Sequence, residues 1–415
     1  MTRLLRHLLL IAACIGLTGA AFGQAGRPSV LPTPWELERF GLERGWRNQA
    51  TLNVAIDRIA YLTADEDNVY AQSRSGIVTA FDAETGKRLW SRLLGPTDAP
   101  SFPAVTNTDH LLIATGMNMF AVDKFNGKLL WRLNLPHHPT TAPGISDHQA
   151  YIGTLDGSAY AFDLKTIRQL FQDQLLPDWS DVSIVWRFRS GAPVTSPPVA
   201  AGRLVNFASE DGSLYSVDMN DGKLRFQFET NGAIQTPIAR NQDSLLIASD
   251  DVRLFSINSL NGKLRWSFVA GTPILEQPQI VGSQVFVAPQ MGGLYALNMF
   301  GGEVQWHQTR ATEFLAAASE FLFASDELGN LLILSRNDGA VIGSIPLREM
   351  SVRVRNDRTD RVFLASPLGL VLCLRERGSE FPTYHKFPER QPMLPEFGDD
   401  EAPAATEPAA SGAAP

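Results

Sequence analysis

Acidic and amide side chains recur along the chain at positions where their oxygens could bind a metal ion. Carboxylate and amide oxygens are the ligands that Ca²⁺ prefers. Each of these side chains, however, opens a hairpin turn, where Asp and Asn accept hydrogen bonds from the turn's own amides. No set of metal ligands can therefore be assigned from them. The six positions are Asp82, Asp123, Asp163, Asp218, Asn258 and Asn298.

Histidine and cysteine give no stronger indication of a chemical site. His137 and His138 are adjacent, with His148 nearby, whereas two metal ligands on one face of a strand need i, i+2 spacing. We interpret them as polar residues of a loop. Cys14 and Cys373 are the only cysteines, which leaves no disulfide framework. The sequence also lacks a Gly-rich phosphate loop and a Gly-x-Ser-x-Gly elbow.

The spacing of the six acidic or amide positions is the most informative feature of the sequence. Successive positions are 41, 40, 55, 40 and 40 residues apart. A fixed period near forty residues indicates a tandem array of one supersecondary unit. In most units a glycine follows the acid or amide after four residues and an aromatic residue follows after eight. The repeat residues of these two kinds are Gly86, Trp90, Gly127, Trp131, Trp186, Gly222, Phe226, Gly262, Trp266 and Trp306.

Each repeat consists of short apolar runs separated by turn residues, a pattern typical of strands. The glycines stand where a hairpin loop needs a positive φ, and the aromatic residues offer a large apolar face to a neighbouring unit. Four strands in each forty residues, repeated eight times from near Arg58, predict an all-β fold, an eight-bladed β-propeller. The last two repeats lack the tryptophan. We expect residues 50–57 to supply the outer strand of the last blade.

The chain divides into four parts by composition. Residues 1–23 have a basic start, an apolar run and a small-x-small site before Gln24, which predicts a secretory signal peptide. Cys14 also ends a lipoprotein-like four-residue pattern, but the following residues stay apolar, so cleavage near Gln24 is the expectation. Residues 24–49 form an N-terminal extension, 50–390 the propeller, and 391–415 a disordered acidic tail rich in Ala and Pro.

The best copy of the repeat, Ala80 to Trp90, resembles the repeat of the pyrroloquinoline-quinone (PQQ) β-propeller family. The resemblance covers about 58–378 and implies the propeller fold. Enzymes of that family usually carry a disulfide between adjacent cysteines near the quinone, and often a Cys-x-x-Cys-His haem site; neither occurs here. The resemblance therefore implies a member without enzymatic activity, for which no cofactor is expected. A PQQ-binding oxidoreductase, or a small-molecule binder using the channel, stays open as the alternative.

The resemblance extends to non-enzymatic members that assist outer-membrane assembly, which consist of a signal peptide and little beyond the ring. It implies an exported scaffold for protein–protein interaction in the periplasm, at the inner face of the outer membrane. The expected partners are envelope or outer-membrane proteins, or extended peptide segments. Signal removal changes the formal charge from −8 to −10, and no Lys/Arg stripe stands out, so nucleic acid is not an expected partner. No transmembrane segment is expected in the mature chain.

One repeat is longer than the others. The gap between Asp163 and Trp186 is 23 residues instead of eight, which places an insertion in the loop between the third and fourth strands of the third blade. Apolar side chains on a loop mark either a contact surface or a loop packed on its own domain. The predicted partner-binding residues of this loop are Phe171, Leu175, Leu176 and Trp179.

Overall fold

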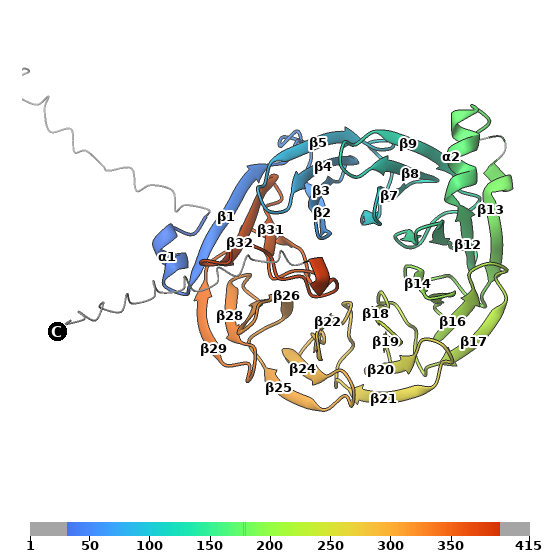
Figure 1. Cartoon of the computed structure of the whole chain (residues 1–415). Coiled ribbons are helices and arrows are strands. Elements are labelled where there is room, and N and C mark those ends of the chain that lie inside the picture. Colours follow the sequence, from blue (N-terminus) through green and yellow to red (C-terminus); the bar gives the residue numbers. More distant parts are fainter. Residues whose placement is uncertain (1–30, 177, 179, 391–415) are drawn as a thin grey trace, which may run out of the picture.

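The computed structural model describes residues 31–176, 178 and 180–390 and shows a ring of eight four-stranded antiparallel sheets. Figure 1 shows the blades arranged one after another in a closed ring. The predicted eight-bladed propeller is confirmed. The predicted signal peptide, Cys14 and the predicted disordered tail lie outside the described residues.

The first four blades follow one another along the chain, each running from the channel to the outer rim. Their strands are β2 (Ile59–Ala64), β3 (Asn68–Ser73), β4 (Ile77–Asp82) and β5 (Arg88–Leu93); β6 (Val105–Thr106), β7 (His110–Thr115), β8 (Asn118–Asp123) and β9 (Leu129–Asn134); β10 (Gly144–Ile145), β11 (Gln149–Gly153), β12 (Ser158–Asp163) and β13 (Ile184–Arg189); and β14 (Val199–Ala201), β15 (Leu204–Ala208), β16 (Ser213–Asp218) and β17 (Leu224–Glu229).

The last four blades repeat this order, except that the eighth takes its outer strand from the beginning of the chain. Their strands are β18 (Ala239–Asn241), β19 (Ser244–Ser249), β20 (Arg253–Asn258) and β21 (Leu264–Val269); β22 (Gln279–Val281), β23 (Gln284–Val287), β24 (Leu294–Asn298) and β25 (Val304–Gln308); β26 (Glu313–Ala317), β27 (Phe321–Ser325), β28 (Leu331–Ser335) and β29 (Val341–Ile345); and β30 (Val352–Arg353), β31 (Val362–Ala365), β32 (Leu370–Glu376) and β1 (Leu42–Gln49).

The burial of the strands explains the sequence pattern. The second and third strands of a blade pack against neighbouring blades on both faces, so β3 and β16 are buried along their whole length. Outer strands such as β5 and β21 alternate between buried and exposed residues, since one face is open to solvent. Buried strands therefore appear as continuous apolar runs, and outer strands as mixed segments with one buried aromatic residue.

The closure of the ring differs from the expectation. β1 pairs antiparallel with β32, Leu42 facing Glu376, and supplies the outer strand of the eighth blade. The prediction that residues 50–57 would do so is wrong, because Asn53 begins a turn there and accepts hydrogen bonds from the amides of Ile56 and Asp57. The N-terminal extension therefore contributes residues 42–49 to the ring.

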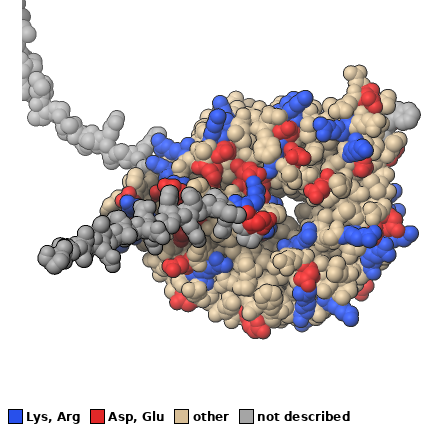
Figure 2. All heavy atoms as spheres, viewed as in Figure 1, with Lys and Arg blue, Asp and Glu red and all other residues tan. Residues whose placement is uncertain are grey.

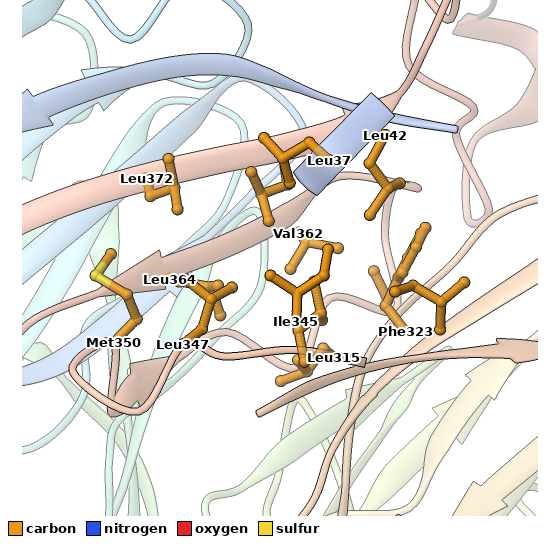
Figure 3. Close-up of a cluster of buried hydrophobic side chains, with 14 of the residues drawn as sticks. Leu37, Leu42, Leu315, Phe323, Ile345, Leu347, Met350, Val362, Leu364 and Leu372 are labelled. Carbon is orange, nitrogen blue, oxygen red and sulfur yellow. The ribbon is translucent and has the colours of Figure 1, made fainter. Parts of the chain in front are cut away.

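Residues before β1 fill the seam between the seventh and eighth blades. The short helix α1 (Pro34–Glu38) buries Leu37, and Leu42 begins the strand that follows. Figure 3 shows both leucines above a cluster to which the two blades contribute Phe323 and Val362, among others. The ring of Phe40 lies against Gly343, where a Cβ would come within 2.2 Å of it. Gly343 holds the position that tryptophan takes in other blades, so the N-terminal segment compensates for that missing side chain.

The described part of the chain ends on one face of the ring. Successive strands of a blade are antiparallel, so the first and third turns of every blade lie on one face and the second turn lies on the other. β32 ends and β1 begins at the first of these faces, which we call the terminal face; the other is the free face. After β32 the chain runs over the terminal face toward the channel and ends its described part in the 3-10 helix η2 (Pro388–Arg390). No helix among the described residues is long and apolar enough to cross a membrane.

Candidate interaction site

The repeated acidic and amide side chains hold the turns on the terminal face. Asp82 Oδ1 accepts hydrogen bonds from the amides of Glu84 and Thr85, at 3.2 and 2.8 Å. Asn258 Oδ1 does the same for Leu260 and Asn261, at 2.9 and 3.3 Å. These oxygens are occupied by their own turns, as the sequence indicates, and the side chains do not converge on one site.

In most blades this turn also carries the aromatic residue of the preceding blade. The Trp90 ring lies on Gly127, where a Cβ would come within 2.6 Å of the indole, and its Nε1 donates to the carbonyl of Lys124 at 2.9 Å. Gly302 and Trp266 repeat this arrangement. The turn therefore requires glycine for two reasons. Its backbone φ is positive, and the indole leaves no room for a Cβ. The repeat tryptophans are buried at the seams between blades. They are Trp46, Trp90, Trp131, Trp186, Trp266 and Trp306.

Trp46 is a repeat residue that sequence reasoning missed. It lies in β1 opposite Cys373, its Nε1 donates to the carbonyl of Ala83 at 2.7 Å, and its ring covers Gly86. It is therefore the tryptophan of the eighth blade. Its distance of 44 residues from Trp90, close to the repeat, was the signal that could have found it. Cys373 is free and buried at the small-residue position, and burial raises the pKa of its thiol.

The insertion of the third blade forms helix α2 (Leu164–Gln172) and the 3-10 helix η1 (Ser180–Ser183). The expectation of a loop is therefore wrong for most of this segment. Asp163 keeps its repeat role in a new form, because it caps the helix by accepting a 2.6 Å hydrogen bond from the amide of Thr166. Leu164 and Ile167 are buried against the second blade. The helix follows from its amphipathic spacing, which the strand period around it concealed.

The helix removes the turn on which Trp131 would rest. Trp131 is fully buried, and its Nε1 has no hydrogen-bond partner among the described residues. In other blades the indole donates to the carbonyl of the residue that follows the repeat Asp or Asn, such as Lys124 after Asp123. In the third blade the residue that follows Asp163 is Leu164, which begins α2. Burying an unpaired donor costs about 1–3 kcal/mol, so the insertion carries a cost in stability.

Two of the predicted partner-binding residues come together in a groove beside α2. Phe171 and Leu176 are partly buried and lie opposite Leu129 and Leu130 of β9, in a cavity of about 470 Å³. Leu175 is exposed and does not line the cavity. Trp179 lies outside the described residues. We call this cavity the α2–β9 groove.

The rim of the α2–β9 groove is basic. Lys128 and Arg168 line it, and Arg132 lines a smaller cavity of about 210 Å³ formed with Leu129, Phe171 and Leu176. All three cationic side chains are exposed. Within the described part of the chain none of them forms an ion pair with a carboxylate, whereas Arg187 and Arg225 elsewhere on the rim do. The groove therefore combines apolar walls with uncompensated positive charge.

The free face carries exposed aliphatic side chains at the tips of its turns. Its turns join the second and third strands of each blade, and those of four blades present a large apolar residue with more than half of its surface exposed. Contiguous exposed apolar surface marks a contact site, and three of these tips lie on the consecutive sixth, seventh and eighth blades. The four residues are Leu155, Met291, Leu328 and Leu368.

Ion pairs on the terminal face hold the C-terminal segment over the channel. Arg361 is fully buried and binds Glu84 of the first blade and Asp360, at 3.0 and 3.2 Å. Burial disfavours its charge, but these contacts outweigh that effect and raise the pKa of the guanidinium. Lys386 binds Asp357 and Arg390 binds Asp67, each at 2.6 Å. The last blade is thereby tied to the first one.

The channel is divided by this segment and by the β30–β31 loop. Two cavities of about 710 and 630 Å³ remain, both bordered by Gln277, Asp357 and Lys386. Figure 2 shows an opening near the centre of the ring with acidic and basic side chains at its rim. Glu276 and Arg355 form an ion pair beside these cavities, and burial raises the pKa of Glu276. Among the described residues no group of three or more His, Cys, Asp or Glu is placed to hold a metal ion.

The ring, its tryptophan–glycine stacks and its repeat turns define the protein as a PQQ-repeat β-propeller. A family model described as "Outer membrane protein assembly factor BamB" matches residues 43–108, 74–179, 172–250 and 231–378. These matches extend over nearly the whole ring, and the chain belongs to this family.

Individual relatives are distant. "Outer membrane protein assembly factor BamB" of Yersinia pestis is 23% identical over 181 residues, which are 39% of this chain and 41% of that protein, so the match spans less than half of the relative's length. The crystal structure of BamB from Moraxella catarrhalis superposes with a TM-score of 0.62 at 17% identity, over 81% of this chain and 98% of that one. The computationally designed Ika8 protein gives 0.60 at 14%, over 76% and 96%. These structural similarities show the fold alone.

Proposed function

We propose that this protein is an exported, non-enzymatic scaffold that assists the assembly of outer-membrane proteins from the periplasmic side. Family membership supports the process, since the matching family is described as an outer-membrane protein assembly factor. The partners would be other proteins of the assembly machinery or extended segments of the proteins being assembled. The chain would bind no cofactor in this role.

The observation that carries the proposal is the apolar free face. Leu155, Met291, Leu328 and Leu368 project from turns of a closed ring in which every blade is a complete four-stranded sheet. A rigid surface that exposes several aliphatic side chains binds a protein partner with little loss of conformational entropy. The terminal face, by contrast, is crossed by the chain's own C-terminal segment. We infer that the free face docks a folded protein of the machinery.

Site-specific photo-crosslinking in the native envelope tests this function. A photoreactive residue at Met291 or Leu328 should give a covalent adduct with a protein of the outer-membrane assembly machinery. The matched control is the same residue at Leu260, which is 66% exposed but lies on a turn of the terminal face. Adducts that are equal at all three positions, or absent at Met291 and Leu328, would contradict the proposal.

A further inference from the structure

The α2–β9 groove has the features of a site for an extended polypeptide. β9 is the last strand of its sheet and, among the described residues, pairs with β8 alone, so one edge of its backbone is open in this part of the chain. An open strand edge binds another extended chain through main-chain hydrogen bonds, and adjacent pockets select alternate side chains. The other outer strands are also edges, but here α2 stands beside the edge as an apolar wall.

The side chains of the groove define what it would take. Leu129, Leu130, Phe171 and Leu176 are only partly buried, which leaves apolar surface to be covered. Lys128 and Arg168 at the rim lack a carboxylate partner within the described residues. A chain that alternates apolar and acidic residues complements both features, because successive residues of a strand point to opposite sides.

The loss of stability that the insertion causes also favours a binding role for the α2–β9 groove. α2 replaces a turn that elsewhere satisfies the tryptophan of the preceding blade, and it leaves Trp131 Nε1 buried without a partner among the described residues. What α2 provides instead is the second wall of the groove. An occupied groove would cover the part of Leu129, Leu130 and Leu176 that stays accessible, which explains why α2 is kept although it leaves the Trp131 indole without a partner among the described residues.

We propose that the α2–β9 groove binds an extended segment of another polypeptide with alternating apolar and acidic residues, which adds as a strand to the open edge of β9. This inference rests on the proposed function and names a second class of partner, an unfolded segment, in addition to the folded protein docked on the free face. The acidic side chains of the segment face Lys128 and Arg168, and its apolar side chains cover Leu130 and Phe171.

A labelled eight-residue peptide that alternates valine and glutamate tests the inference by fluorescence anisotropy with the full chain. We expect the peptide to bind, and Lys128→Glu and Arg168→Glu each to weaken binding at least tenfold. The matched control is Lys263→Glu, which changes the equivalent lysine of the fifth blade, where no insertion follows; it should leave binding unchanged. Equal binding of a valine–lysine peptide, equal loss in the control, or no binding at millimolar peptide would overturn the inference.

Hydrogen exchange distinguishes strand addition from simple adhesion. Bound peptide should slow exchange of backbone amides in β9, which is an edge strand in the free protein. Binding without protection of β9 would contradict strand addition. The outcome is separate from that of the proposed function, because crosslinking at Met291 and Leu328 probes the free face and does not depend on the α2–β9 groove.

Discussion

At the scale of residues, the repeated Asp, Gly and Trp act together at each seam between blades. Asp82 fixes the turn, Gly86 leaves room, and Trp46 lies on that glycine and donates to the Ala83 carbonyl. One contact therefore joins two blades through packing and a hydrogen bond. The repeat could be read from sequence because all of its parts recur at fixed spacing.

The missing turn in the third blade allows the contribution of the indole hydrogen bond to stability to be measured. Trp266→Phe leaves the Met299 carbonyl without its donor, whereas Trp131→Phe removes an Nε1 that has no partner among the described residues. Both changes lose similar packing, so the free energy of unfolding should fall by about 1 kcal/mol more for Trp266→Phe. Urea denaturation measures the difference. Equal losses would show that Trp131 finds a partner in solution.

His385 should respond to pH. Its Nε2 lies 2.8 Å from the Ala317 carbonyl, and burial lowers its pKa below the usual 6.5, outweighing that hydrogen bond and Asp360. A lowered pKa means that the contribution to stability is fully present above about pH 6.5 and is lost as pH falls through the folded-state pKa. An NMR titration of the ring should give a midpoint below 6.5. A midpoint at or above that value would contradict the buried position.

At the scale of elements, the two departures from the repeat are the N-terminal closure and α2. Neither was predicted from the local pattern, although the spacing of Trp46 from Trp90 was a signal for β1. β1 pairs with β32 from the opposite end of the chain, and its half-exposed, charged sequence resembles a loop more than a strand. α2 lies within a strand repeat, so its helical period was hidden, and the groove depends on side chains of two blades that no spacing relates.

If α1 seals the seam between the seventh and eighth blades, loss of its buried side chain should destabilise the ring. Leu37 is 1% exposed in the cluster between the seventh and eighth blades, and Trp35, two residues away, is 68% exposed. Leu37→Ala should lower the free energy of unfolding by about 2–5 kcal/mol, because it opens a cavity in that seam. Trp35→Ala is the control and should change it by less than about 0.5 kcal/mol. Similar effects of the two changes would mean that α1 does not seal the ring.

At the scale of the whole molecule, a closed ring separates two faces, of which one is crossed by the C-terminal segment and the other is not. The terminal face is held by Arg361, Lys386 and Arg390, and the free face exposes aliphatic turn residues. Eight blades and their order were predictable, since they depend on a period that runs along the chain. The charges that tie the last blade to the first were not, because they join residues far apart in sequence.

The scaffold hypothesis and the alternative of a quinone enzyme differ in whether the purified protein binds PQQ. We expect PQQ and Ca²⁺ to produce neither cofactor absorbance nor a rise in melting temperature, because the described residues offer no group of ligands for the metal. Differential scanning fluorimetry with both additions measures this. Dye-linked oxidation of an alcohol or sugar that EDTA abolishes would establish the enzymatic alternative.

The central claim is that the protein assists outer-membrane protein assembly as a scaffold. The most direct measurement is the amount of folded β-barrel protein in the outer membrane of cells that lack the gene. We expect this amount to fall without it and to be restored by the wild-type chain, but not by a chain with Met291, Leu328 and Leu368 changed to Glu, three exposed positions that tolerate charge without unfolding the ring. Unchanged β-barrel levels in the deletion strain, or full restoration by the triple variant, would contradict the account.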